Sequence, residues 1–165
     1  MPTAPRANAF DRLLTDRRLG WLALAMLATV VTAVVRGHAD WARVPANVWA
    51  HLALMGVALL LTPVMLVRRK GDRWHRQLGW VWVSAMLATA AISLTIRPAN
   101  HSNFSVIYIL SVYVLLMVPR FVWMARTHQV AKHRAGVRGM VIGALLIAGF
   151  FTFPFDRMLG RWLFG

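Results

Sequence analysis

The chain has 165 residues, of which 59% are hydrophobic, and its formal net charge is +14 at neutral pH. A soluble domain of this length has too small an interior to bury so much apolar surface, so the composition excludes an ordinary soluble globular protein. Cysteine is absent, which excludes a disulfide framework, a thiolate metal site and a cysteine nucleophile.

Five apolar stretches are long enough for helices that cross a bilayer, because about 20 apolar residues cover its hydrocarbon core. They lie at about 19–35, 48–67, 78–96, 104–124 and 140–155. We predict an all-α, polytopic membrane protein with five transmembrane helices: one leading helix and a four-helix bundle of two similar hairpins. Residues 1–18 form a cytoplasmic N-terminal segment, and residues 19–165 form a single transmembrane domain.

A secretory signal is the alternative interpretation of the first apolar stretch, since Arg17 and Arg18 precede it. The stretch is longer than the apolar run of a typical signal, and no small-residue cleavage site follows it at Arg36-Gly37-His38. We therefore interpret it as a retained helix.

Lysine and arginine are distributed unevenly between the two sides of this predicted topology. Fourteen of the 19 lie in or beside the N-terminal segment and the second and fourth connections, and five lie elsewhere. Because positive loops stay in the cytoplasm, we place the N-terminus inside and the C-terminus outside. Orientation and anionic headgroups explain the basic charge, so the predicted partner is the lipid bilayer and not nucleic acid.

The acidic residues are five aspartates, and none lies deep in a predicted span. A proton-coupled transporter usually needs an ionisable relay at mid-membrane. We predict no such relay and no catalytic residue, so the chain is not expected to be an enzyme in its own right.

Four of the six histidines alternate between the two predicted faces of the membrane. His51 opens the second span and His101 precedes the fourth, both outside, whereas His75 and His133 precede the third and fifth spans, both inside. Each inner histidine is followed by an arginine, Arg76 or Arg134, and each hairpin contains a proline, Pro63 or Pro119. This order predicts two like-oriented hairpins with histidines at both membrane faces.

The segment Gly71-Asp72-Arg73-Trp74-His75-Arg76-Gln77-Leu78-Gly79, followed by Lys132-His133-Arg134 and a helix near Met140, resembles an uncharacterised bacterial membrane-protein family. Members of that family carry two His-Arg motifs at cytoplasmic helix starts and histidines at the opposite interface. The resemblance covers about residues 48–155 and implies a bacterial inner-membrane location without a known activity. This chain departs from the pattern after His133-Arg134, where residues 135–139 intervene before Met140.

The layout is also similar to that of transmembrane di-haem b cytochromes, in which histidines of alternate helices pair on two haem irons. This likeness implies an outer pair of His51 and His101 and an inner pair of His75 and His133. A histidine near the positive end of a helix dipole favours the neutral imidazole that binds iron. Arg76, Arg134 and Arg138 could pair with haem propionates.

Gly79 and Gly136 share a helical face with His75 and His133, respectively, and their missing side chains could admit the macrocycle. We therefore predict haem b as the cofactor, with a quinone or a soluble donor as the redox partner.

Three alternatives stay open. Each histidine could simply face solvent or headgroups; His51, Met55 and His101 could form a copper site; or the protein could be a non-catalytic accessory subunit or assembly factor of a respiratory or photosynthetic complex.

Overall fold

The computed structural model describes residues 14–96 and 106–165, and all regular structure in these two stretches is helical. The five long segments are α2 (Asp16–Arg36), α3 (Ala46–Val67), α4 (Arg73–Ser93), α5 (Val106–Arg126), and a last segment made of α6 (Val130–Met140), the π-helix η2 (Val141–Ile147) and α7 (Ala148–Phe150). Two short elements complete the list: the 3₁₀-helix η1 (Gly37–Arg43) and α8 (Met158–Phe164). The predicted all-α class is confirmed.

Three helical stretches of the described chain are long and apolar enough to cross a membrane. They are Asp16–Arg43, Ala46–Val67 and Tyr108–Arg126, with mean hydropathies of 1.9, 2.1 and 1.7. Helix α4 opens with the polar run Arg73–Gln77, and the last segment is divided by the π-helix η2. The prediction of five membrane spans is therefore not confirmed.

Two helices begin well before the apolar stretches predicted for them. Helix α4 begins at Arg73 and the last helical segment at Val130, whereas apolar residues predict starts near 78 and 140. For α4 the cause is a cap, since the Asp72 side chain accepts a hydrogen bond of 2.6 Å from the backbone N–H of His75. The last segment ends at Phe150, ahead of the turn at Phe155 and Asp156, whose φ values are 64° and 56°. Hydropathy detects the apolar part of a helix but not its polar ends.

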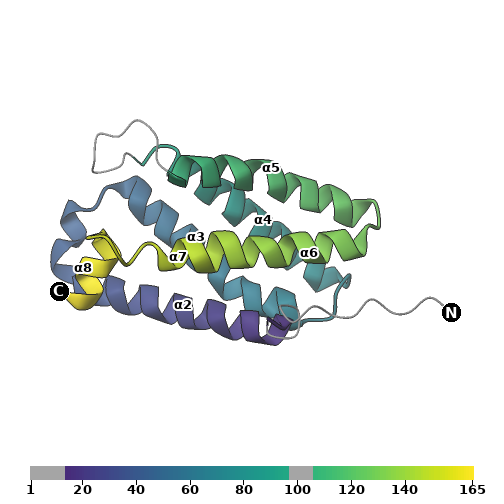
Figure 1. Cartoon of the computed structure of the whole chain (residues 1–165), viewed down its shortest axis with the longest axis horizontal. Helices are drawn as coiled ribbons and strands as arrows, with labels where there is room; N and C mark the ends of the chain where they lie inside the picture. Colours follow the sequence, from purple (N-terminus) through teal and green to yellow (C-terminus); the bar gives the residue numbers. More distant parts are fainter. Residues whose placement is uncertain (1–13, 97–105) are drawn as a thin grey trace.

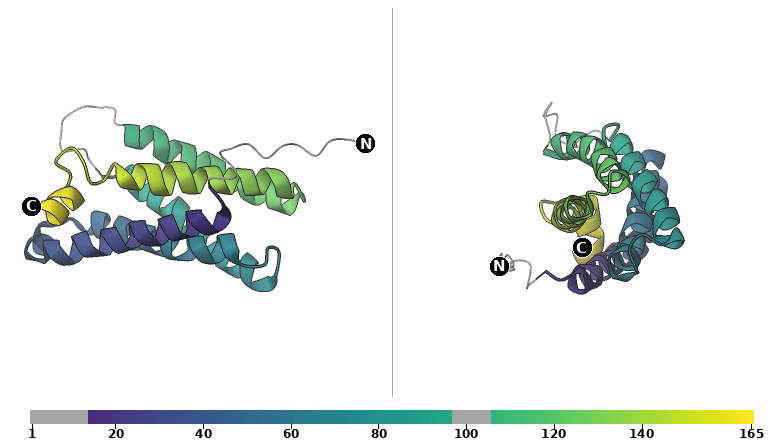
Figure 2. Two further views of the ribbon diagram at one scale, coloured as in Figure 1. Left: turned by 60° about the horizontal axis from the view of Figure 1, so that its bottom comes forward. Right: turned by 90° about the vertical axis from the view of Figure 1, so that its right-hand side faces the viewer.

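The long segments lie side by side in one bundle (Figure 1). Seen end-on, α2, α3, α4 and α5 form an open arc in chain order, and the last segment lies within its open side (Figure 2). The last segment accordingly contacts α5 through α6 and α2 through η2. The leading helix α2 is thus part of the bundle and packs on both α3 and the last segment.

Helix α2 approaches α3 closely where Gly20 meets Pro63. A Cβ atom on Gly20 would lie 3.1 Å from the Pro63 Cβ. Pro63 has no N–H to donate within α3, and the adjacent Thr62 hydroxyl donates to the Ala58 carbonyl at 2.7 Å. The Trp82 indole N–H in turn donates to Thr62 Oγ1 at 3.1 Å, which ties α4 to α3 in the apolar interior.

The C-terminal helix α8 folds back against the end of α2. The Trp162 ring lies over Gly37, where a Cβ atom would come within 2.0 Å of it. Its indole N–H donates to Asp40 Oδ2 at 3.3 Å. Trp162, Leu159 and Phe153 form a small apolar cluster with Ala33. Glycine at position 37 therefore permits the contact that closes this end of the bundle.

Candidate functional site

The predicted outer histidine, His51, lies in α3 and contacts α4. Its Nδ1 is 3.0 Å from Ser93 Oγ, and the Ser93 hydroxyl donates to the Thr89 carbonyl at 2.9 Å. A hydroxyl has a single proton to donate, so the imidazole Nδ1–H must be the donor to Ser93. The Nε2 atom of His51 then keeps its lone pair. Its predicted partner His101 lies outside the described residues, so the outer pair and the copper alternative stay predictions.

The predicted inner histidines lie at the opposite end of the bundle, at the starts of α4 and α6 (Figure 1). The Nδ1 atom of His133 lies 3.0 Å from the Phe121 carbonyl oxygen of α5. A carbonyl can only accept, so Nδ1 of His133 carries a proton and donates this hydrogen bond. Nδ1 of His75 is buried and has no hydrogen-bond partner among the described residues.

The electrostatics of the two inner histidines are linked. Burial lowers the pKa of His75, which precedes the apolar part of α4, and the charge of His133 lowers it further. The two imidazoles, 58 positions apart in the sequence, are therefore close enough for their charges to interact. Neutral imidazole is the form that binds a metal.

The two glycines that were expected to leave room for a macrocycle are packed against other side chains. A Cβ atom on Gly136 would lie 2.3 Å from Cε1 of Phe121, and one on Gly79 would lie 3.3 Å from Cε of Met65. Phe121 is itself only 8% exposed. The interpretation of these glycines as a haem cradle is therefore wrong: they admit Phe121 and Met65, which hold the helices together.

The arginines of the two His-Arg motifs have different partners. Arg76 donates to the Gly71 carbonyl oxygen at 3.3 Å and so closes the turn before α4. Arg134 lies 3.5 Å from Asp16 Oδ2 at the start of α2.

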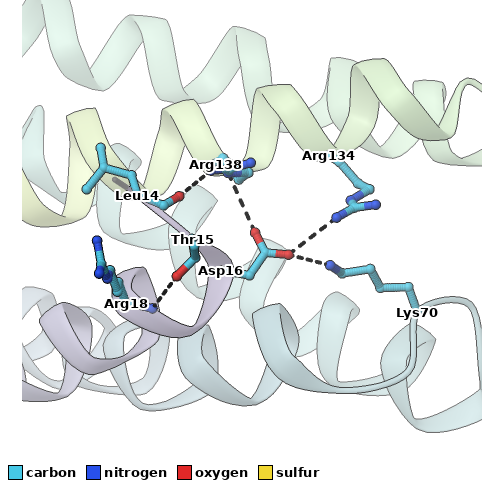
Figure 3. Close-up of polar contacts among 7 residues, drawn as sticks. All are labelled: Leu14, Thr15, Asp16, Arg18, Lys70, Arg134 and Arg138. Carbon is cyan, nitrogen blue, oxygen red and sulfur yellow. Dashed lines mark hydrogen bonds and ion pairs between the residues drawn. The ribbon is translucent and has the colours of Figure 1, made fainter. Parts of the chain in front are cut away.

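Asp16 is the centre of an ion-pair cluster that joins three parts of the chain (Figure 3). Its carboxylate contacts Lys70 Nζ at 2.6 Å, Arg134 Nη2 at 3.5 Å and Arg138 Nε at 3.5 Å. Arg138 also donates to the Leu14 carbonyl oxygen. We call these four charged residues the Asp16 cluster. Sequence spacing gives no signal for it, because its members come from α2, the turn before α4, and α6.

Among the described residues, no group of three or more histidine, aspartate or glutamate side chains is placed to hold a metal ion. The donor arrangement these residues offer at the inner end is a pair of imidazoles, those of His75 and His133. Taken together, fold and site define an all-helical protein with apolar helices able to cross a membrane and with histidines at both ends of its bundle.

Searches against protein-family models, curated proteins and solved structures find no match to this chain. The resemblance of its His-Arg motifs to an uncharacterised bacterial family stays a prediction.

Proposed function

We propose that all five long segments cross a bacterial inner membrane, with the N-terminus in the cytoplasm. The exposed side chains support this, because α4 and the last segment also present large apolar residues outward. Trp80 and Val81 of α4 are 51% and 49% exposed, and Ile147 of the last segment is 52% exposed. In water, such surface on every long helix would favour association with other apolar surfaces.

The absence of cysteine makes this topology directly testable, since each introduced cysteine is the single thiol of its variant. We expect a membrane-impermeant maleimide to label Leu94→Cys and Phe155→Cys on intact cells. Arg69→Cys and Ala131→Cys should react only after the membrane is opened. Arg69 and Leu94 form one pair, on either side of α4. Ala131 and Phe155 form the other pair, near the two ends of the last segment. Labelling of both members of a pair on intact cells would show that the segment between them does not cross.

We further propose that the protein binds one b-type haem iron between His75 and His133 and acts as an electron carrier. The observation that supports this most is the state of the two imidazoles. The Nδ1–H of His133 donates to a backbone carbonyl, which fixes the orientation of that ring, and burial lowers the pKa of His75, whose buried Nδ1 has no hydrogen-bond partner among the described residues. A backbone acceptor on the second ring nitrogen is the usual way of orienting a ligating histidine.

A haem supplies reversible one-electron transfer at its iron, and its potential depends on its axial ligands and surroundings. The chain's own contribution is to hold two imidazoles near one end of the bundle. From His51 to Val67, α3 rises by about 24 Å, so His51 lies too far from the inner histidines to share an iron with them. A quinone or a soluble donor is the proposed redox partner.

A reduced-minus-oxidised spectrum of the detergent-purified protein, expressed with ample haem, tests this proposal. We expect the alpha band of a low-spin b haem, and its loss in His75→Ala and in His133→Ala. His38→Ala is the matched control, because His38 is an exposed residue of η1 at the other end of the bundle. A wild-type protein without the band, or a His75→Ala variant that keeps it, would overturn the haem assignment.

A second candidate is a non-catalytic accessory subunit of a larger respiratory or photosynthetic membrane complex. The packing of Phe121 against Gly136 favours it, because the inner end of the bundle is filled by a side chain where a macrocycle was expected. Comigration with a larger complex after mild solubilisation, together with a flat haem spectrum, would support this candidate over the electron carrier.

A further inference from the structure

The carboxylate of Asp72 lies at the start of α4 and holds the first turn of that helix. It accepts a hydrogen bond of 2.6 Å from the backbone N–H of His75, the third residue of α4. This is the contact of an N-cap residue, which satisfies a backbone donor that has no partner within the helix. The turn buries little apolar surface, since Arg73, Trp74 and Arg76 are exposed, so its order depends on this cap.

The connection that leads into α4 holds Asp72 itself in place. Arg68, which follows the last residue of α3, places Nη2 3.2 Å from Asp72 Oδ2, and its Nε donates to the same oxygen at 3.3 Å. Gly71 has a φ of 87°, a conformation that favours glycine, and its carbonyl oxygen accepts a hydrogen bond from Arg76. The carboxylate that caps α4 is therefore tied to the end of α3 on one side and to His75 on the other.

The charge of Asp72 also reaches the imidazole of His75. Burial lowers the pKa of His75, and the charge of His133 lowers it further, whereas the Asp72 carboxylate acts in the opposite direction. Of the charges that act on His75 in the described part of the chain, that of Asp72 is negative and the others are positive. The other carboxylate at this end, Asp16, is shared by three cations. Asp72 thus supplies negative charge to a histidine in a basic setting.

We propose that Asp72 is a positioning residue of the His75 site, which orders the turn that carries the imidazole and sets the charge beside it. The inference rests on the proposed haem between His75 and His133 and identifies what regulates that site. An ordered turn loses less conformational freedom when its imidazole binds iron. A negative charge beside the haem favours the ferric state, because oxidation adds a positive charge. Asp72 therefore strengthens haem retention through its cap and lowers the midpoint potential through its charge.

Three substitutions of Asp72 separate these two effects in the detergent-purified protein. Asp72→Asn and Asp72→Ser keep an oxygen that caps α4 but remove the charge, so both should raise the midpoint potential and leave haem retention near that of the wild type. Asp72→Ala also removes the cap and should retain haem about fivefold less tightly, the equivalent of one lost helix cap. Redox titration of the alpha band measures the potential, and haem transfer to excess apomyoglobin measures retention.

Asp40→Asn is the matched control, because it removes the same charge from η1 at the other end of the bundle. It should change neither the potential nor the retention. Arg68→Gln, which removes the cation paired with Asp72, should lower the potential, a shift of opposite sign to that of Asp72→Asn. Equal shifts of potential in Asp40→Asn and Asp72→Asn, or unchanged retention in Asp72→Ala, would overturn the proposal.

Amide hydrogen exchange of the apoprotein tests the cap without haem. Mass spectrometry of fragments that contain residues 73–77 should show exchange about fivefold faster in Asp72→Ala than in Asp72→Ser, because the acceptor of the His75 N–H is lost. Equal exchange in these two variants beside a normal haem band would overturn this inference alone. A difference in exchange beside a wild-type protein that lacks the band would contradict only the haem.

Discussion

Substitution of Gly136 by alanine is expected to destabilise the protein by about 1–3 kcal/mol, the usual cost of inserting a methyl group into a filled core. The added Cβ would lie 2.3 Å from Cε1 and 2.6 Å from Cδ1 of Phe121. Phe121 cannot yield freely, because its ring is buried and its carbonyl oxygen accepts the His133 Nδ1–H. The midpoint of thermal unfolding in detergent, followed by circular dichroism, measures the effect.

Gly139 of the same helix provides a matched control for Gly136. A Cβ atom on Gly139 would meet no atom of the described residues within 4 Å, so Gly139→Ala should leave stability unchanged or raise it by about 0.5–1 kcal/mol through helix propensity. The double variant Gly136→Ala/Phe121→Leu should recover part of the loss, because the smaller side chain relieves the contact. Equal unfolding midpoints for Gly136→Ala and Gly139→Ala would contradict the packing described.

Substitution of Asp16 by asparagine is expected to lower the free energy of unfolding by about 1–3 kcal/mol. The carboxylate is 21% exposed and is the shared anionic partner of Lys70, Arg134 and Arg138, so its removal leaves three cations facing one another. The first turn of α2 also loses a negative charge that complements the helix dipole. The same thermal measurement applies, and the loss should diminish at high salt because exposed cations are then screened.

Asp40→Asn is the matched control at the other end of the bundle. Asp40 is 45% exposed and pairs with Arg43, which is 85% exposed. It also accepts the Trp162 indole N–H, which an asparagine amide oxygen can still accept. The loss of its charge should therefore cost no more than about 1 kcal/mol. In Asp16→Asn, the additional substitution Lys70→Gln should restore part of the stability by removing one of the repelling charges. An Asp16→Asn variant as stable as Asp40→Asn would show that the cluster does not hold the three segments together.

The histidine pattern shows how far sequence order could predict the candidate site. Alternation of His51, His75 and His133 along the apolar stretches placed them correctly at opposite ends of the bundle. Sequence order gave no sign of the Ser93 hydroxyl and the Phe121 carbonyl, which decide the tautomers of His51 and His133. A carbonyl acceptor twelve positions away depends on how two helices pack, and periodicity does not record that.

The prediction that Gly79 and Gly136 leave room for a macrocycle is wrong, because sequence spacing does not show what packs against a glycine. Spacing places Gly79 on the helical face of His75 and Gly136 on that of His133. The missing side chain of each glycine predicts room for a cofactor. In the bundle, Met65 and Phe121 occupy those positions. Whether a missing side chain leaves a gap or admits a neighbour depends on the opposite helix, which one-dimensional spacing cannot identify.

The sequence by itself determined the helical class, the approximate helices and the concentration of cations in alternate connections, because apolar length and charge are local properties of the chain. The tertiary structure decided that α2 packs between α3 and the last segment and that Asp16 meets cations from two distant segments. These features depend on which helix faces meet, and that choice is made by the packing of all segments together.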